Sequence, residues 1–120
     1  MKVLLVEPDK ILQKTYASAL ESSGNVVVGV SSAQQALNEL NIEIPEIIFM
    51  ELELTKNSGI ELLYELRSYG DLDNIRIVIL STIPEKEMLK KFGDFKEQFN
   101  IYKYLYKPSA TINKLIELTK

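Results

Sequence analysis

Short apolar runs alternate along the whole chain with segments in which apolar residues recur at helical spacing. Five of these runs are rich in Val, Ile, Leu or Tyr, and most are nearly continuous, so they are predicted to be strands. Continuous apolar strands are typical of a parallel sheet that helices cover on both faces. The predicted strands are residues 2–7, 26–30, 46–52, 75–80 and 101–106.

The segments between these runs carry apolar stripes that predict helices. Asp9 is placed to cap the start of the first helix, and Gly24 is placed to end it. The second helix follows Ser32, the third runs out at Gly70, and the last closes the chain. The stripes consist of Ile11, Leu12, Tyr16, Ala19 and Leu20; Ala33, Ala36, Leu37 and Leu40; Ile60, Leu63, Tyr64 and Leu66; and Ile112, Leu115, Ile116 and Leu118.

Residues 84–100 have a less regular pattern. A helical stripe is kept there, but Gly93 and Asp94 interrupt it, so one long helix and a helix followed by an irregular turn both fit. The stripe consists of Met88, Phe92, Phe95 and Phe99, which we expect to be core residues first.

The composition is that of one globular domain, with 120 residues of which 46% are hydrophobic and 26% charged. A chain of this length can bury one core without disulfides or a structural metal, so we predict a single domain over residues 1–120. The sequence has no Cys and no His, which excludes thiolate and imidazole metal sites and catalysis by Ser-His or Cys-His pairs.

The charge balance argues against a nucleic-acid ligand, because the formal net charge is −3 and the pI is about 5.0. The apolar start of the chain is only four residues long before Glu7 and Pro8. Such a run is too short for a signal-peptide core or a membrane span, so we expect a cytoplasmic protein with no membrane contact.

Polar residues stand where four of the predicted strands end. They are Glu7, Glu51, Ser81 and Lys107. Ligands of an open parallel sheet bind outside the carboxyl ends of its strands. We therefore expect two carboxylates, a hydroxyl and an ammonium group to meet at one edge of the sheet.

With these motifs in this order and spacing, the chain resembles the receiver domain of two-component response regulators over essentially its whole length. The resemblance rests on residues 2–7, on residues 47–51 with Gly59 eight positions later, on residues 78–81 and on residues 104–108. It implies a doubly wound, flavodoxin-like α/β fold in three layers. The five-stranded parallel sheet would have the order 2-1-3-4-5, with two helices on one face and three on the other.

In such domains a phosphoryl group moves from a donor histidine to an aspartate, with Mg²⁺ held by carboxylates. Two positions depart from this pattern. Pro8 stands where the second acidic residue is expected, and Glu51 stands at the phospho-acceptor position, one methylene longer than aspartate. We expect weak Mg²⁺ binding and phosphoryl transfer that is very slow or absent. Thr82 also replaces a small residue beside Ser81.

Simpler structural roles are expected for several of these residues. Glu7 and Glu51 are predicted to pair with Lys107, and Asp9 to cap the first helix. If a metal binds at all, its ligands would be Glu7, Glu51 and Glu53, although we expect the Glu53 side chain to be solvated. The resemblance also implies a cis peptide bond between Lys107 and Pro108.

Two residues are candidates for a conformational switch, namely Ser81 and Tyr104. The Ser81 hydroxyl has a second possible role, which is to satisfy a loop N–H. Tyr102, Tyr104 and Tyr106 share one side of the last strand by the two-residue period. They are predicted either to pack in the core or to form an interaction face for a protein partner. Residues 84–100, which are longer than the resemblance implies, lie next to this strand.

The preferred interpretation is a degenerate receiver that acts as a phosphorylation-independent signalling or protein-interaction module. We expect no enzyme activity, no cofactor, no direct contact with nucleic acid, and a monomer or weak dimer. Its partner would be a signalling component or an output domain. Two alternatives stay open. One is a working Mg²⁺-dependent receiver that uses Glu51, and the other is a small-ligand binder at the carboxyl-end crevice of the strands.

Overall fold

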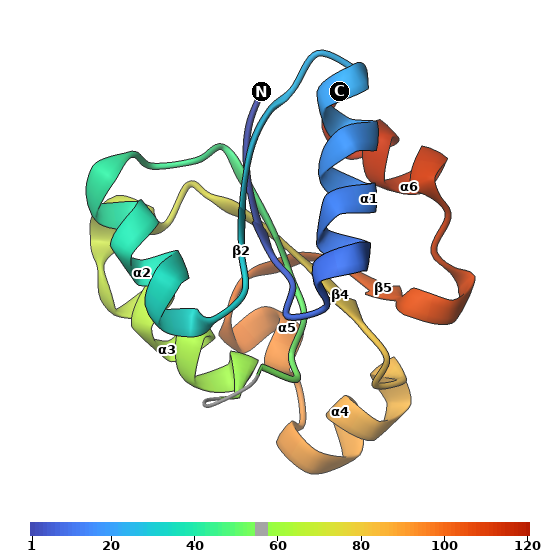
Figure 1. Ribbon diagram of the computed structural model, residues 1–120. Coiled ribbons are helices and arrows are strands. Elements are labelled where there is room, and N and C mark those ends of the chain that lie inside the picture. Colours follow the sequence, from blue (N-terminus) through green and yellow to red (C-terminus); the bar gives the residue numbers. More distant parts are fainter. Residues whose placement is uncertain (55–57) are drawn as a thin grey trace.

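The structure is a computed structural model that describes residues 1–54 and 58–120. Its five strands form one parallel sheet in the order β2-β1-β3-β4-β5, which confirms the predicted topology (Figure 1). The strand bounds differ from the prediction by at most two residues at an end. The strands are β1 (Lys2–Val6), β2 (Val26–Val30), β3 (Ile47–Met50), β4 (Arg76–Ser81) and β5 (Ile101–Tyr106).

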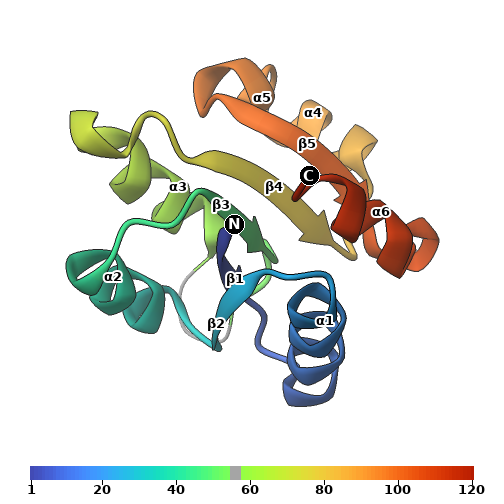
Figure 2. The same ribbon diagram turned by 90° about the horizontal axis from the view of Figure 1, so that it is seen from above.

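In the described part of the chain, two helices cover one face of the sheet, as predicted, whereas four helices instead of three cover the other face (Figure 2). One apolar core lies under α1 and α6, and the other lies under α2, α3, α4 and α5. The helices are α1 (Lys10–Ser22), α2 (Ala33–Ile42), α3 (Gly59–Ser68), α4 (Glu85–Phe92), α5 (Phe95–Gln98) and α6 (Ile112–Glu117), and short 3-10 helices follow α3 and β5. No described helix is long and apolar enough to cross a bilayer.

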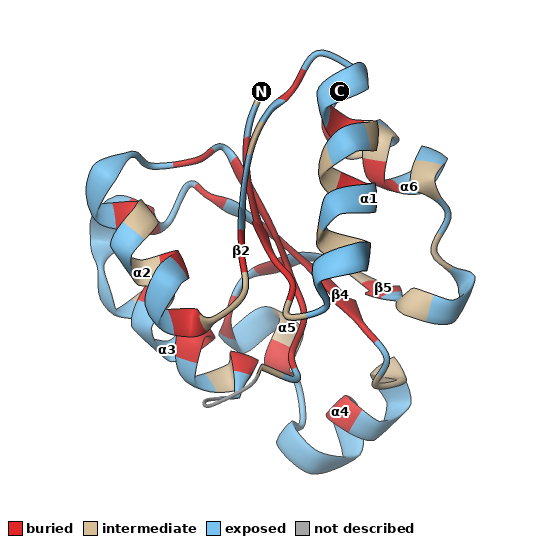
Figure 3. Cartoon of the chain, viewed as in Figure 1, coloured by how far each residue is buried: buried red, intermediate tan, exposed pale blue. Residues whose placement is uncertain are grey.

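The central strands are buried on both faces, which explains their continuous apolar sequences. All four residues of β3 are buried, and only the first residue of β1 and of β4 is exposed. Figure 3 shows the buried residues concentrated along the middle of the sheet. The carboxyl ends of these strands are therefore held rigidly, and the polar residues that follow them have fixed positions.

Side-chain caps set the starts of four helices. The carboxylate of Asp9 accepts hydrogen bonds from the backbone N–H groups of Ile11 and Leu12, as its predicted capping role requires. The hydroxyls of Ser32, Ser58 and Thr111 do the same for α2, α3 and α6. The chain leaves α1 through Gly24, whose φ of 94° favours glycine.

The irregular segment after β4 forms two helices instead of one. The break falls at Gly93, where φ is 67°, so that α4 ends there and α5 begins two residues later. Met88, Phe95 and Phe99 are buried as expected, whereas Phe92 remains 38% exposed. The break turns the short α5 so that Phe95 reaches the core beside Tyr104.

The edge strand β5 is not regular. Its register against β4 shifts so that Ile77 faces Ile101 and Val78 faces Lys103, which leaves Tyr102 as an extra residue. The three tyrosines consequently do not form one uniform row. Tyr104 is half-buried in the core, while Tyr102 and Tyr106 are 48% and 40% exposed. The two-residue period is interrupted at Tyr102, where the bulge lies, and is regular again from Tyr104 to Tyr106.

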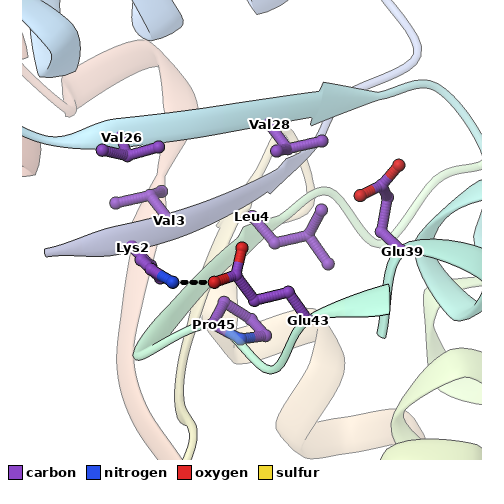
Figure 4. Close-up of a pocket in the computed structure, with 8 residues that line it drawn as sticks. All are labelled: Lys2, Val3, Leu4, Val26, Val28, Glu39, Glu43 and Pro45. Carbon is purple, nitrogen blue, oxygen red and sulfur yellow. Dashed lines mark ion pairs between the residues drawn. The ribbon is translucent and has the colours of Figure 1, made fainter. Parts of the chain in front are cut away.

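The opposite edge strand, β2, is open to solvent on its α2 side. Val26 and Val28 are exposed there and line a small hollow of about 30 Å³ (Figure 4). An ion pair between Lys2 and Glu43 closes the hollow near the start of β1. It lies at the amino end of the sheet, away from the polar residues at the carboxyl ends.

Candidate functional site

Two carboxylates and one ammonium group meet at the carboxyl ends of the strands. Glu7 follows β1, Glu51 follows β3, and Lys107 follows β5. The Lys107 ammonium lies 2.6 Å from a carboxylate oxygen of Glu7 and 2.9 Å from one of Glu51. The side chains of Glu7 and Glu51 are only 2% and 4% exposed. We call these three residues the strand-end cluster, and they form the ion pairs predicted from the sequence.

The Glu51 carboxylate is saturated with hydrogen-bond donors. One oxygen accepts from Lys107 and, at 3.3 Å, from the backbone N–H of Thr82. The other accepts from the backbone N–H groups of Leu52 and Glu53, at 2.7 and 3.2 Å. The side chain that stands at the phospho-acceptor position is thus tied to β4, to β5 and to its own loop.

The pKa values within this cluster follow from its contacts. Burial alone would raise the pKa of Glu51, but the hydrogen bond and the charge of Lys107 outweigh it and, with the backbone N–H of Glu53, hold that pKa below its usual value. Burial would lower the pKa of Lys107, yet its hydrogen bonds to Glu51 and Glu7 raise it. Glu51 and Lys107 therefore both carry charge near neutral pH.

The segment after β1 does not bring a further carboxylate into the cluster. Pro8 occupies the second position of the expected acidic pair, and the Asp9 carboxylate is turned to the start of α1. The Asp9 backbone N–H instead donates to the second oxygen of Glu7, at 3.0 Å. Glu53 is exposed and accepts from the Thr82 hydroxyl at 3.2 Å. Within residues 1–54 and 58–120, no three acidic side chains gather closely enough to hold a metal.

The loop after β4 connects this cluster to Tyr104. The buried Ser81 hydroxyl accepts from the backbone N–H of Ile83 at 3.1 Å, which is the simpler of its two predicted roles. The Tyr104 hydroxyl donates to the Ile83 carbonyl oxygen, and its ring meets Phe95 edge-on with centroids 5.7 Å apart. Burial raises the pKa of Tyr104 to about 12. The loop that contacts Glu51 is therefore also the loop that fixes Tyr104.

The predicted cis bond between Lys107 and Pro108 is wrong. The described chain contains no cis peptide bond. Pro108 instead sits in the first turn of a 3-10 helix over Lys107–Ser109, a position that the fixed φ of proline suits. The trans isomer is the intrinsically preferred one for a prolyl bond, and here Lys107 reaches both carboxylates with it.

A family model for the response regulator receiver domain matches residues 3–120 of the chain. The chain belongs to this family. A curated relative, an uncharacterized response regulatory protein of Vibrio cholerae, is 29% identical over 113 residues, which are 92% of this chain and 44% of that protein. A protein-glutamate methylesterase/protein-glutamine glutaminase of Clostridium acetobutylicum is 31% identical over 90 residues, which are 73% of this chain and 26% of that enzyme. The chain thus spans less than half the length of these relatives.

Solved structures agree with this assignment. The crystal structure of a sensor protein from Polaromonas sp. JS666 has a TM-score of 0.85 at 25% identity, covering 97% of this chain and 90% of that one. The structure of the chemotaxis response regulator CheY4 of Vibrio cholerae has a TM-score of 0.84 at 18% identity, covering 98% and 94%, and supports the fold alone. Receiver domains are signalling modules that interact with other signalling proteins and output domains.

Packing explains the glycine that belongs to the receiver pattern. A Cβ on Gly59 would lie 2.7 Å from the Cα of Leu52 and 2.9 Å from the carbonyl oxygen of Glu51. The start of α3 therefore lies directly against the end of β3, at a distance that only glycine allows.

Two residues of this receiver site were not singled out as site residues from the sequence. The Gln13 amide donates to the carbonyl oxygens of Glu7 and Val30, which ties α1 to the ends of β1 and β2. Ile83 contributes only backbone groups, bonded to Ser81 and Tyr104. Gln13 lies beside the helical stripe of α1 and has no motif around it, and backbone contacts leave no side-chain signature.

Proposed function

We propose that this receiver domain is a degenerate one, which signals through protein interactions without being phosphorylated. The observation that carries this proposal is the state of Glu51. Its two oxygens accept four hydrogen bonds, and the cation beside it is Lys107, which also pairs with Glu7. A phosphoryl donor would have to displace these partners from a buried carboxylate that is longer than aspartate.

The same residues fit Mg²⁺ poorly. Mg²⁺ requires near-octahedral coordination by oxygen ligands, and Pro8 offers neither a side-chain oxygen nor a charge where one carboxylate is expected. The place between Glu7 and Glu51 is taken by the Lys107 ammonium. We therefore propose that the domain works without a cofactor. We also propose that the domain is located in the cytoplasm.

The proposal is tested by adding beryllofluoride or acetyl phosphate to the domain in the presence of excess Mg²⁺. We expect no ¹H–¹⁵N shifts at the strand ends and no added phosphoryl mass in the wild-type domain. The matched control is the double variant Pro8→Asp/Glu51→Asp, which rebuilds the acidic pair and the shorter acceptor and is expected to respond.

Two outcomes would overturn the proposal. A phosphoryl adduct on Glu51 of the wild type would show that the acceptor still works. Mg²⁺-dependent shifts at Glu7, Glu51 and Glu53 of the wild type would show that a metal site survives.

We further propose that the partner, a signalling protein or an output domain, binds the face formed by α4, β5 and α6. Tyr102 and Tyr106 are the exposed tyrosines of this face, and tyrosine combines a large contact area with a polar tip. Tyr104 supports this face indirectly, because its hydroxyl donates to the Ile83 carbonyl oxygen and so holds the loop after β4. Replacing Tyr102 and Tyr106 by Ala is expected to cost a native complex about 2 kcal/mol while leaving the fold intact.

A further inference from the structure

A groove runs between α2 and α3, which lie side by side on one face of the sheet (Figures 1 and 2). It consists of two adjoining hollows of about 430 and 340 Å³, which share Gln34, Leu37 and Glu65 as walls. No residue of the strand-end cluster lines it. An inference about this groove therefore does not rest on whether Glu51 is phosphorylated.

The lining of the groove is apolar at the bottom. Leu40, Leu62 and Leu72 are buried there, and Leu37 is half-buried between them and solvent. Large side chains stand exposed beside this floor. Tyr64 and Tyr69 are 57% and 52% exposed, and Ile44 is 46% exposed. An apolar floor with exposed tyrosines at its margin is the composition of a protein-binding surface.

The margin of the groove carries charge of one sign. Glu61 and Glu65 project from α3, and Asp71 follows it, all exposed. Among the described residues that line the groove there is no Lys or Arg. Arg67 lies on the same helix, but its guanidinium donates to the carbonyl oxygens of residues 72, 73, 75, 99 and 100. An acidic margin of this kind favours an occupant with positive charge beside its apolar side chains.

The secondary structure of the two walls favours a helical occupant over an extended one. Both walls are helices, whose backbone N–H and C=O groups already bond within the helix. An extended peptide lying between them would find no strand edge for its own backbone groups, whereas a helix satisfies its own. Because α2 and α3 each have ten residues, each is about 15 Å long, which matches two to three turns of a third helix.

We propose that the α2–α3 groove binds an amphipathic helix of a partner protein, with Lys or Arg flanking its apolar stripe. Apolar residues at positions i, i+3 or i+4, and i+7 of that helix would enter the groove over Leu37 and Leu40. Its cations would face Glu61, Glu65 and Asp71. Tyr69, which lines the groove and is exposed, offers a further contact to a cation or an aliphatic stem.

The test uses a 14-residue acetylated and amidated peptide of Leu and Lys, with Leu at helical spacing, titrated into the ¹⁵N-labelled domain. We expect shifts confined to α2, α3 and the turn after α3, and binding that weakens as salt is added. A peptide of the same composition in shuffled order, without an apolar stripe, is expected to bind at least tenfold more weakly.

Two double variants with the same change of charge test where the Leu/Lys peptide binds. The double variant Glu65→Lys/Asp71→Lys is expected to weaken the Leu/Lys peptide at least tenfold. The variant Glu21→Lys/Glu117→Lys makes the same change of charge on exposed carboxylates of α1 and α6, and is expected to stay within twofold of the wild type. Equal losses in both variants would overturn the proposal. Shifts centred on β5, equal binding of the shuffled peptide, or self-association of the domain through α2 and α3 would overturn it too.

Discussion

At the scale of single residues, Lys107 balances two buried carboxylates at once. Glu7 and Glu51 come from different strands, and like charges in such proximity repel unless a cation lies between them. Removing one partner of a buried ion pair costs far more than the pair contributes as a whole, because an uncompensated charge stays behind. Lys107 is therefore the residue on which the charge state of the site depends.

Replacing Lys107 by Met is expected to lower the free energy of unfolding by about 3 kcal/mol at pH 7, since it leaves two buried carboxylates without a cation. Urea titration followed by circular dichroism measures this change. The control is Lys96→Met, which breaks an exposed pair with Glu85 and is expected to cost less than about 1 kcal/mol. Equal costs for the two variants would mean that burial does not govern the Lys107 contacts.

The same ion pairs predict how stability depends on pH. The folded pKa of Glu51 lies below its unfolded value of about 4.3. Its contribution is thus fully present above that pH and is lost as the pH falls through the folded pKa. The folded pKa of Lys107 lies above its unfolded value of about 10.4, so its contribution is lost as the pH rises through the folded pKa. Urea titrations across the pH range are expected to give a plateau between these limits.

For the Lys107→Met variant, the free energy of unfolding is expected to increase as the pH falls below neutral, whereas that of the wild type does not. Two neighbouring buried carboxylates without a cation raise the pKa of one of them, so a proton stabilises the folded state. The deficit of the variant relative to the wild type is expected to be smaller at pH 5 than at pH 7. A deficit that does not change between these values would contradict the role of Lys107 in keeping Glu51 ionised in the wild type.

At the scale of elements, the contact between α3 and the end of β3 depends on Gly59. Gly59→Ala is expected to lower the free energy of unfolding by about 1 to 3 kcal/mol, because the new Cβ would meet backbone atoms of Leu52 and Glu51. Gly70→Ala is the matched control, since its Cβ would have no atom within 4 Å. Thermal unfolding compares the two, and a Gly59→Ala variant as stable as Gly70→Ala would contradict the close approach.

Arg67 joins α3 to two other elements through its guanidinium. It donates to the carbonyl oxygens of Phe99, at 2.7 Å, and of Asn100, at 3.0 Å, and these two bonds hold the turn between α5 and β5. A third bond, at 3.1 Å, goes to the carbonyl oxygen of Leu72. Arg67→Ala is expected to cost about 2 kcal/mol, because the half-buried carbonyls lose a charged donor. Arg67→Lys, with one point charge instead of a fork, is expected to recover part of this loss. Urea titration of both variants measures these changes in the free energy of unfolding. Full recovery by Lys would contradict the role of the several N–H donors of the guanidinium.

At the scale of the whole molecule, burial predicts a gradient of local stability across the sheet. β1, β3 and β4 are covered on both faces, while the edge strands β2 and β5 carry exposed residues. Backbone amides of the three central strands are expected to exchange most slowly with deuterium, and those of β2 and β5 faster. Hydrogen exchange followed by NMR measures this order. Slowest exchange in β2 would show that its open edge is covered in solution.

The sequence by itself determined the fold, because the elements alternate strictly and each carries its own signal. Nearly continuous apolar runs marked the strands that are buried on both faces, and side-chain caps such as Asp9 marked helix starts. The strand-end residues Glu7, Glu51 and Lys107 were predicted to meet, since parallel strands bring their carboxyl ends to one edge. These conclusions depend on local pattern and topology, which a sequence displays directly.

Other features of the protein depend on contacts between segments far apart in the sequence, and only the tertiary structure shows them. The bulge at Tyr102 arises from pairing between β4 and β5, so the period of β5 alone could not show that Tyr102 lies outside the regular alternation that Tyr104 and Tyr106 keep. The trans bond before Pro108 depends on how the chain turns after β5 to place Lys107. The donors of Glu51 are mostly backbone N–H groups, and the α2–α3 groove lies between two helices whose sequences give no measure of their separation. Each of these features is a relation between segments, and it exists only once the packing of the core has set their distance.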